Sequence, residues 1–169
     1  AIYCQDADRI PEIAVATAEV TGIDFAVYKD GADVVLESER GRARIEYDAT
    51  NESYRYVMAN GDPLELGSFA NGFATEDVWF EQTAGHRYPN ALPNIYKSLF
   101  TPRVKHTADI LISLKDGYYY GWTPFGRFVR LAATHGNALQ ASSNAFLMST
   151  HRQFPLFVRA DDAKPLLRG

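Results

Sequence analysis

The stretch "IDFAVYKDGADVVLESERGRARIEYD", residues 23–48, decides the fold class of this chain. It holds three short runs rich in β-branched and aromatic residues, and the turn signals "DGA" and "RG" separate them. Such runs predict consecutive strands joined by tight turns, which is an antiparallel meander. "ESYRYVM" at 52–58 predicts a fourth strand, and "NGDPL" at 60–64 predicts the turn that ends it.

A strand and a helix are expected before the meander. "AIYCQ" at 1–5 predicts a strand, and "DADRIPEIAVATAEVTG" at 6–22 predicts a helix. Asp8 can cap this helix, Pro11 suits its first turn, and Gly22 stands where a C-terminal glycine is expected. Residues 1–62 therefore predict a small α+β subdomain with an antiparallel meander.

The rest of the chain, 63–169, is expected to form the C-terminal part of an α/β core. Helices are predicted around "TEDVWFEQ" and over "PNALPNIYKSLF". "ADILISL" at 108–114 is a near-continuous apolar run, typical of a strand inside a parallel or mixed sheet. "NAFLMST" at 144–150 predicts a second buried strand, and "FPLFVRA" at 154–160 a third or an edge strand. The expected fold class is α/β (α+β).

Composition narrows the class of protein. The chain has 169 residues, 46% of them hydrophobic and 13% aromatic, enough for one packed domain with or without a small appendage. The formal net charge is −4 with both signs interspersed, which argues against a nucleic-acid-binding patch. No apolar run approaches the roughly 20 residues of a membrane span. No signal-peptide pattern opens the chain, so a soluble protein is expected, with the cytoplasm favoured.

Two further features bear on redox chemistry and completeness. Cys4 is the only cysteine, which excludes an intrachain disulfide and a zinc site built from cysteines. The chain opens on "AIYC", as if a strand were already under way, and stops at "KPLLRG". We therefore expect a piece of a longer protein.

No complete catalytic set is visible. The four histidines, His86, His106, His135 and His151, form no HxH or HExxH pattern, and no P-loop or GxGxxG motif occurs. Asp62 fits ordinary turn chemistry, whereas Asp109 could orient a ligand or cap the strand that it begins. Ser142 and Ser143 lack the GxSxG pattern of a nucleophile elbow.

His135, in "THGN", is the best single candidate for chemistry. A lone histidine is more often a structural or surface residue than a ligand. Here Gly136 lets the backbone approach another group closely, and Thr134 or Asn137 can fix the imidazole tautomer.

The order of several segments resembles the C-terminal region of the alkaline phosphatase superfamily, in its type I phosphodiesterase and nucleotide pyrophosphatase branch. The segments run from about Gly22 to Thr150: the meander, "YRYVMANGDPLEL", "YPNALPNIYKSLFTPR", "ADILISLKDGYYYG" and "THGNALQASSNAFLMST". Each motif is short, and it is their order and spacing that carry the resemblance.

The resemblance implies a metal-dependent phosphohydrolase that cleaves phosphate mono- or diesters or nucleotide pyrophosphates through a covalent phospho-enzyme. It implies two zinc ions in the complete enzyme, with His135 as one metal ligand, and a mixed-sheet core to which residues 63–169 belong. The meander would belong to an inserted or cap-like part that shapes substrate access. The family's nucleophile and its other ligands precede this region, so the chain holds no catalytic residue of its own. We expect it to be inactive alone, to retain no zinc, and to pair with the missing N-terminal part of the same enzyme.

Two other interpretations stay open. The chain could be a non-catalytic α/β ligand-binding or interaction module that uses the aromatic loops at 69–80 and 117–128. A third, weaker hypothesis is an independent zinc site formed by the four histidines converging in space.

Overall fold

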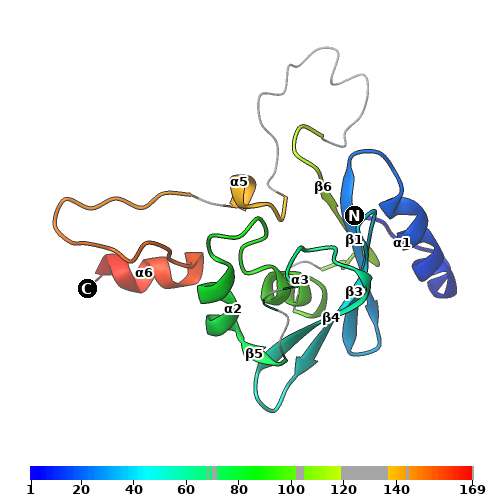
Figure 1. Ribbon diagram of the computed structural model, residues 1–169, viewed down its shortest axis with the longest axis horizontal. Coiled ribbons are helices and arrows are strands. Elements are labelled where there is room, and N and C mark those ends of the chain that lie inside the picture. Colours follow the sequence, from blue (N-terminus) through cyan, green and yellow to red (C-terminus); the bar gives the residue numbers. More distant parts are fainter. Residues whose placement is uncertain (68, 70–71, 102–104, 119–136, 144, 169) are drawn as a thin grey trace.

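The computed structural model describes residues 1–67, 69, 72–101, 105–118, 137–143 and 145–168. Its centre is a six-stranded antiparallel sheet in the order β5-β4-β3-β2-β1-β6 (Figure 1). The strands are β1 (Ile23–Asp30), β2 (Asp33–Ser38), β3 (Gly41–Asp48), β4 (Ser53–Gly61), β5 (Ala74–Thr75) and β6 (Ile110–Leu114). The helices are η1 (Ala7–Arg9), α1 (Ile10–Ala18), α2 (Glu76–Thr83), α3 (Ala91–Phe100), α5 (Gln140–Ser143) and α6 (Ala160–Arg168).

The predicted meander is confirmed, and with it the mixed α/β class. Consecutive strands from β1 to β4 pair antiparallel, with Asp30 opposite Asp33 and Ser38 opposite Gly41. Gly31 has a φ of +63° in the two-residue turn between β1 and β2. Only glycine takes up such a backbone conformation without strain, so the "DGA" signal indicated the turn correctly.

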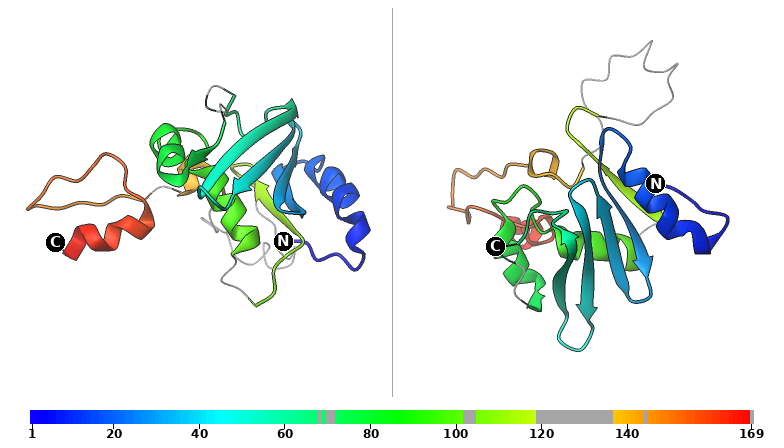
Figure 2. Two further views of the ribbon diagram at one scale, coloured as in Figure 1. Left: turned by 90° about the horizontal axis from the view of Figure 1, so that it is seen from below. Right: turned by 45° about the vertical axis from the view of Figure 1, so that its right-hand side comes forward.

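Helix α1 covers one face of the sheet (Figure 2). Its buried residues Ala14 and Ala18 pack with Ala26, Val35 and Ile110. The short alanine side chains let the helix lie close to the strands. Pro11 lies in the first turn of α1 as expected, but the predicted cap Asp8 lies within η1, and Arg9 precedes α1 without a side-chain cap. Asp6 caps η1 by accepting a hydrogen bond from the Asp8 amide at 3.1 Å.

The larger core lies on the opposite face, beneath α2 and α3. Trp79 of α2 is 1% exposed, and its indole Nε1 donates to the backbone oxygen of Tyr54 at 3.0 Å. Other large members of this core come from β1 to β4, from α3 and from the connections that precede β5 and α3: Phe25, Val27, Val34, Leu36, Ile45, Tyr54, Tyr56, Leu64, Leu66, Tyr88, Leu92, Ile95 and Leu99.

Strand β6 occupies a different position from the one predicted. The run 108–114 was expected inside a parallel or mixed sheet, but β6 is the last strand of an antiparallel sheet and pairs with β1. The predicted first strand contributes one isolated bridge, between Ile2 and Ile110. The apolar character of β6 comes from burial by the cores on both faces, because Ile110 packs with α1 and Leu111 with the larger core.

The two C-terminal strands were predicted wrongly. Residues 145–159 have no regular secondary structure, and α6 begins at Ala160. Asp161 and Asp162 lie in the first turn of α6, where carboxylates favour a helix start. Elements on both sides of the expected boundary at 62 and 63 share the sheet and the larger core, and the boundary itself stays a prediction.

Candidate functional site

Polar side chains gather at the end of the sheet where β2 turns into β3. At this end β1 begins and β4 and β6 finish, as the strand pairing requires. Gly41 and Gly61 lie opposite each other there, with φ values of +117° and +73°. A Cβ on Gly41 would come within 1.8 Å of the Asn60 carbonyl oxygen, so glycine is needed for the strands to approach this closely. This approach brings the β2–β3 turn beside the chain that follows β4.

Arg40 stands in that turn and is the centre of the cluster. Its Nη2 donates to Asp24 Oδ1 at 2.9 Å, to the Pro63 carbonyl oxygen at 2.7 Å and to the Tyr88 hydroxyl at 2.8 Å. The Tyr88 hydroxyl in turn donates to Asp24, with distances of 3.1 and 3.0 Å to the two carboxylate oxygens. The guanidinium therefore ties together three segments that are far apart in the sequence.

The charges of the cluster balance. Asp24 is fully buried, and its carboxylate faces the Arg40 guanidinium, whose side chain is 26% exposed. Glu65 lies nearer the surface, 3.6 Å from Arg40 and 3.0 Å from Arg87. Burial lowers the pKa of Arg40, but the hydrogen bond to Asp24 and the nearby negative charges outweigh burial and hold the pKa above its ordinary value. The carboxylates of Asp24 and Glu65 thus balance the guanidinium groups of Arg40 and Arg87.

This arrangement is better suited to stabilising the fold than to catalysing a reaction. Burial and the neighbouring Asp24 carboxylate raise the pKa of the Tyr88 hydroxyl, so it stays a neutral hydrogen-bond donor. A buried charge pair is tolerated when hydrogen bonds satisfy its remaining polar atoms, and here Tyr88 and Pro63 do so. We therefore interpret Asp24, Arg40 and Tyr88 as the group that holds this end of the sheet together.

His135, the predicted metal ligand, lies outside the described residues. The described chain resumes two residues later at Asn137, whose Nδ2 donates to the Leu114 carbonyl oxygen at 2.9 Å and to Asp116 Oδ1 at 3.2 Å. The Gln140 amide donates to the Arg87 carbonyl oxygen at 2.7 Å. The segment 137–143 is thereby fixed at the end of β6, beside the Arg40 cluster.

The other candidate carboxylates have structural partners. Asp109 Oδ2 accepts a hydrogen bond from the Cys4 amide at 2.8 Å, which joins the start of β6 to the N-terminal segment. Asp62 accepts from the Tyr56 hydroxyl at 2.9 Å and from the Gly67 amide at 2.7 Å, so it organises the turn after β4.

The candidate histidines and serines have no catalytic arrangement within the described residues. His86 Nδ1 accepts from the Tyr88 amide at 3.1 Å, whereas His106 and His151 are exposed. Ser143 Oγ donates to the Asn137 carbonyl oxygen at 3.1 Å. Among the residues that the structure describes, no three His, Cys, Asp or Glu side chains gather as a metal-binding group. His135 is not among the described residues, so its role as a metal ligand stays a prediction.

The Arg40 cluster was missed by the sequence analysis, although one signal was present. Asp24 interrupts the apolar run "IDFAV", and a carboxylate inside a buried strand needs a cation or several donors. The partner could not be found in the same way, because Arg40 and Tyr88 carry no local pattern that marks them.

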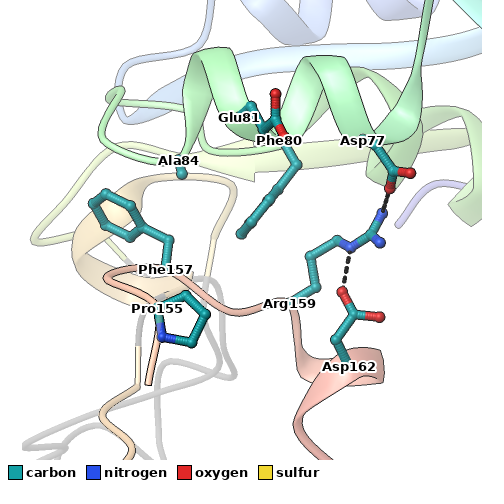
Figure 3. A pocket seen from close by; sticks show the side chains of 8 residues that line it. All are labelled: Asp77, Phe80, Glu81, Ala84, Pro155, Phe157, Arg159 and Asp162. Carbon is teal, nitrogen blue, oxygen red and sulfur yellow. Dashed lines mark hydrogen bonds and ion pairs between the residues drawn. The ribbon is translucent and has the colours of Figure 1, made fainter. Parts of the chain in front are cut away.

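Surface hollows lie outside this cluster, and Arg159 of the segment before α6 lines each of the three described below. The hollow of Figure 3 lies between α2 and the chain before α6, where Arg159 contacts Asp77 at 2.7 Å and Asp162 at 2.8 Å. A neighbouring hollow is mostly apolar and is lined by Phe80 of α2 and by residues of the segments 145–147 and 154–160, among others. The third lies around the β3–β4 connection and the start of α2, with Lys97 of α3 and Arg159 at its edge.

Buried tyrosines predict a loss of stability at high pH. Burial, and then the nearby Tyr47 and Glu76, raise the pKa of Tyr54 to about 12, and burial also raises those of Tyr56 and Tyr88. An unfolded tyrosine titrates near pH 10, so the unfolded state loses protons first and stability falls as the pH rises above about 10. Urea midpoints followed by circular dichroism at about pH 8 and about pH 11 should show this fall. Tyr54→Phe should reduce the pH dependence, and equal midpoints at both pH values would contradict the expectation.

None of the helices described for this chain has the length and apolar character needed to cross a membrane. No family model, no curated protein and no solved structure matches the chain.

Proposed function

We propose that this chain is the C-terminal part of a metal-dependent phosphohydrolase of the alkaline phosphatase superfamily, to which His135 contributes one zinc ligand. The substrate would be a phosphate mono- or diester or a nucleotide pyrophosphate. The nucleophile and the other ligands would come from the polypeptide that precedes this region. The proposal rests on the order of the sequence segments.

One structural observation supports it. In the resemblance, the run "ADILISLKDGYYYG" leads to "THG" and then to a strand, whereas residues 145–150 form no strand in this chain. The residues directly after "THG" return to the strand that this run forms, since Asn137 and Ala138 contact Leu114 and Ser113 of β6. Such a return is what a ligand fixed at a strand end requires, because a metal ligand must be held by rigid elements.

The chemistry expected of His135 follows from its residue type. A neutral imidazole is a suitable zinc ligand, and its second nitrogen needs a hydrogen-bond partner that fixes the tautomer. Two zinc ions would neutralise phosphoryl oxygens and stabilise the leaving oxygen. A catalytic zinc site needs three protein ligands and an open position, so His135 alone is insufficient.

Replacing His135 with alanine in the complete enzyme is the direct test. We expect zinc content to fall and hydrolysis of a chromogenic phosphodiester to drop by more than the roughly 10- to 100-fold loss caused by removing an outer hydrogen-bond partner of a ligand. His151→Ala is the matched control, because His151 is exposed and is expected to change neither readout. Unchanged zinc content and activity in His135→Ala would refute the ligand assignment.

A non-catalytic interaction module is the second candidate, and one observation favours it. Phe146, Met148 and Leu156 are 85%, 79% and 90% exposed in the segment that runs away from the sheet before α6 (Figure 1). Exposed apolar side chains grouped in one segment are typical of a surface that another protein covers. Analytical ultracentrifugation separates the two candidates, since an incomplete core should aggregate whereas a module should be monomeric or form a closed dimer.

A further inference from the structure

Residues 145–168, here called the C-terminal arm, extend away from the sheet (Figures 1 and 2). The arm presents the large apolar side chains of Phe146, Met148 and Leu156 to solvent, each at least 79% exposed. Removing such side chains from water is favourable, so the arm is a surface that gains stability when it is covered.

An apolar groove of about 560 Å³ runs between the arm and α2. Phe80 of α2, Ala84 and Pro89 form one wall. The other wall consists of apolar arm residues: Ala145, Phe146, Leu147, Phe154, Pro155, Leu156, Phe157 and Val158. The exposed side chains and the groove therefore belong to one continuous apolar surface.

The two walls of this groove carry opposite charges. Helix α2 has three carboxylates and no lysine or arginine, whereas the arm from 145 to 159 has two arginines and no carboxylate. One pairing between them already exists within the chain, because Arg159 contacts Asp77 at 2.7 Å. Opposite charges on two surfaces favour their association and fix its register.

Glu81 and Arg152 are available for a second pairing of this kind. Both side chains are exposed, and neither forms an ion pair with the residues that the structure describes. Glu81 lines the hollow of Figure 3 on the α2 side. Arg152 lies in the arm between Met148 and Leu156, and its guanidinium donates to the Leu166 carbonyl oxygen.

A second copy of the chain has the right charges to cover this surface. Each chain carries both the acidic helix and the arm with its arginines and exposed apolar residues. In a two-fold dimer, every contact between two different residues forms twice, once in each direction. An arm of one copy on α2 of the other therefore brings together opposite charges at two places.

We propose that two copies of this chain form a two-fold dimer in which the arm of each copy covers the apolar groove of the other. Phe146 and Met148 of one copy contact α2 of the other, and Arg152 of each copy pairs with Glu81 of the other. The proposal rests on the second candidate function, the interaction module, and gives that module its partner. Its test measures association and not zinc content, so its failure leaves the assignment of His135 unaffected.

Charge reversal combined with mixing is the direct test. Sedimentation equilibrium of the full chain should give a dimer dissociation constant on the order of 10 μM, since a small interface forms a weak complex. Glu81→Arg and Arg152→Glu each place like charges at both contacts, and each should weaken the dimer at least about tenfold. An equimolar mixture of the two variants should restore the wild-type dissociation constant, because both ion pairs then form between unlike chains. Absence of that recovery would overturn the proposal.

Substitutions of exposed apolar residues test the other half of the contact. Phe146→Ser combined with Met148→Ser should weaken the dimer about tenfold or more and leave the unfolding midpoint unchanged, since both side chains are exposed. Val20→Ser is the matched control, because Val20 is 56% exposed beside α1 and should not affect association. A chain that stays monomeric would refute the dimer but not the interaction module. Aggregation that the arm substitutions do not change would refute both.

Discussion

Arg40→Ala is expected to lower the free energy of unfolding by about 3–5 kcal/mol, the cost typical of breaking a buried ion pair on one side. The substitution leaves the fully buried Asp24 carboxylate without its cation. It also removes the donor to the Pro63 carbonyl oxygen, which fixes the chain after β4. Urea denaturation followed by circular dichroism measures the effect.

Arg44→Ala is the matched control for this variant. Arg44 lies on β3 and pairs with Asp30 at 2.8 Å and Asp33 at 2.9 Å, but its side chain is 38% exposed. Exposed ion pairs contribute little, so we expect a change below about 1 kcal/mol. If both variants lost the same free energy of unfolding, burial of Asp24 would not make the Arg40 ion pair more stabilising than an exposed pair.

The second large effect is expected for Trp79→Ala, at about 3–5 kcal/mol. Trp79 is 1% exposed and joins α2 to the larger core, and its indole N–H donates to the Tyr54 carbonyl oxygen. Alanine leaves a cavity and an unpaired buried acceptor, and both effects act in the same direction. Thermal or urea unfolding followed by circular dichroism measures the loss without relying on the indole.

A neighbouring residue separates core packing from helix propensity. Val78 precedes Trp79 on α2 and is 38% exposed, so Val78→Ala should change stability by less than about 0.5 kcal/mol. Trp79→Phe keeps much of the ring but loses the N–H donor, and it should lie between the wild type and Trp79→Ala. The assigned role of Trp79 would be wrong if Trp79→Ala were as mild as Val78→Ala.

The local part of the fold was predictable because its signals are local. Gly31 marks a turn, short runs rich in β-branched and aromatic residues mark the strands β1 to β4, and Pro11 marks the first turn of a helix. The position of β6 depends instead on which strand lies beside it. An apolar run has the same sequence pattern in a strand inside a parallel sheet as in an outer strand that is buried by cores on both faces. The pattern therefore could not determine the position of β6 in the sheet.

The C-terminal error has a related cause. Phe154, Leu156 and Phe157 read as a strand because apolar residues predict burial, yet Leu156 is 90% exposed. Sequence patterns assume that apolar residues find a core within the same chain, and this segment does not follow that rule in the described structure.

The polar site was only half accessible from the sequence. Asp24 stands out inside an apolar strand, but its partners Arg40 and Tyr88 are brought to it by the β2–β3 turn and by the approach to α3. Such convergence is set by tertiary packing rather than by spacing. His135 was proposed as a metal ligand from the order of the sequence segments and not from tertiary contacts. Its role stays a prediction.

The position of β6 also has a kinetic consequence. Hairpins from β1 to β4 close over turns of a few residues, whereas the pairing of Ala26 with Ile112 must close a loop of about half the chain. The entropy lost on loop closure grows with loop length, and non-local pairing slows folding. The antiparallel meander can therefore form from local contacts alone, while β1 acquires its second neighbour only after the intervening helices have brought β6 into place.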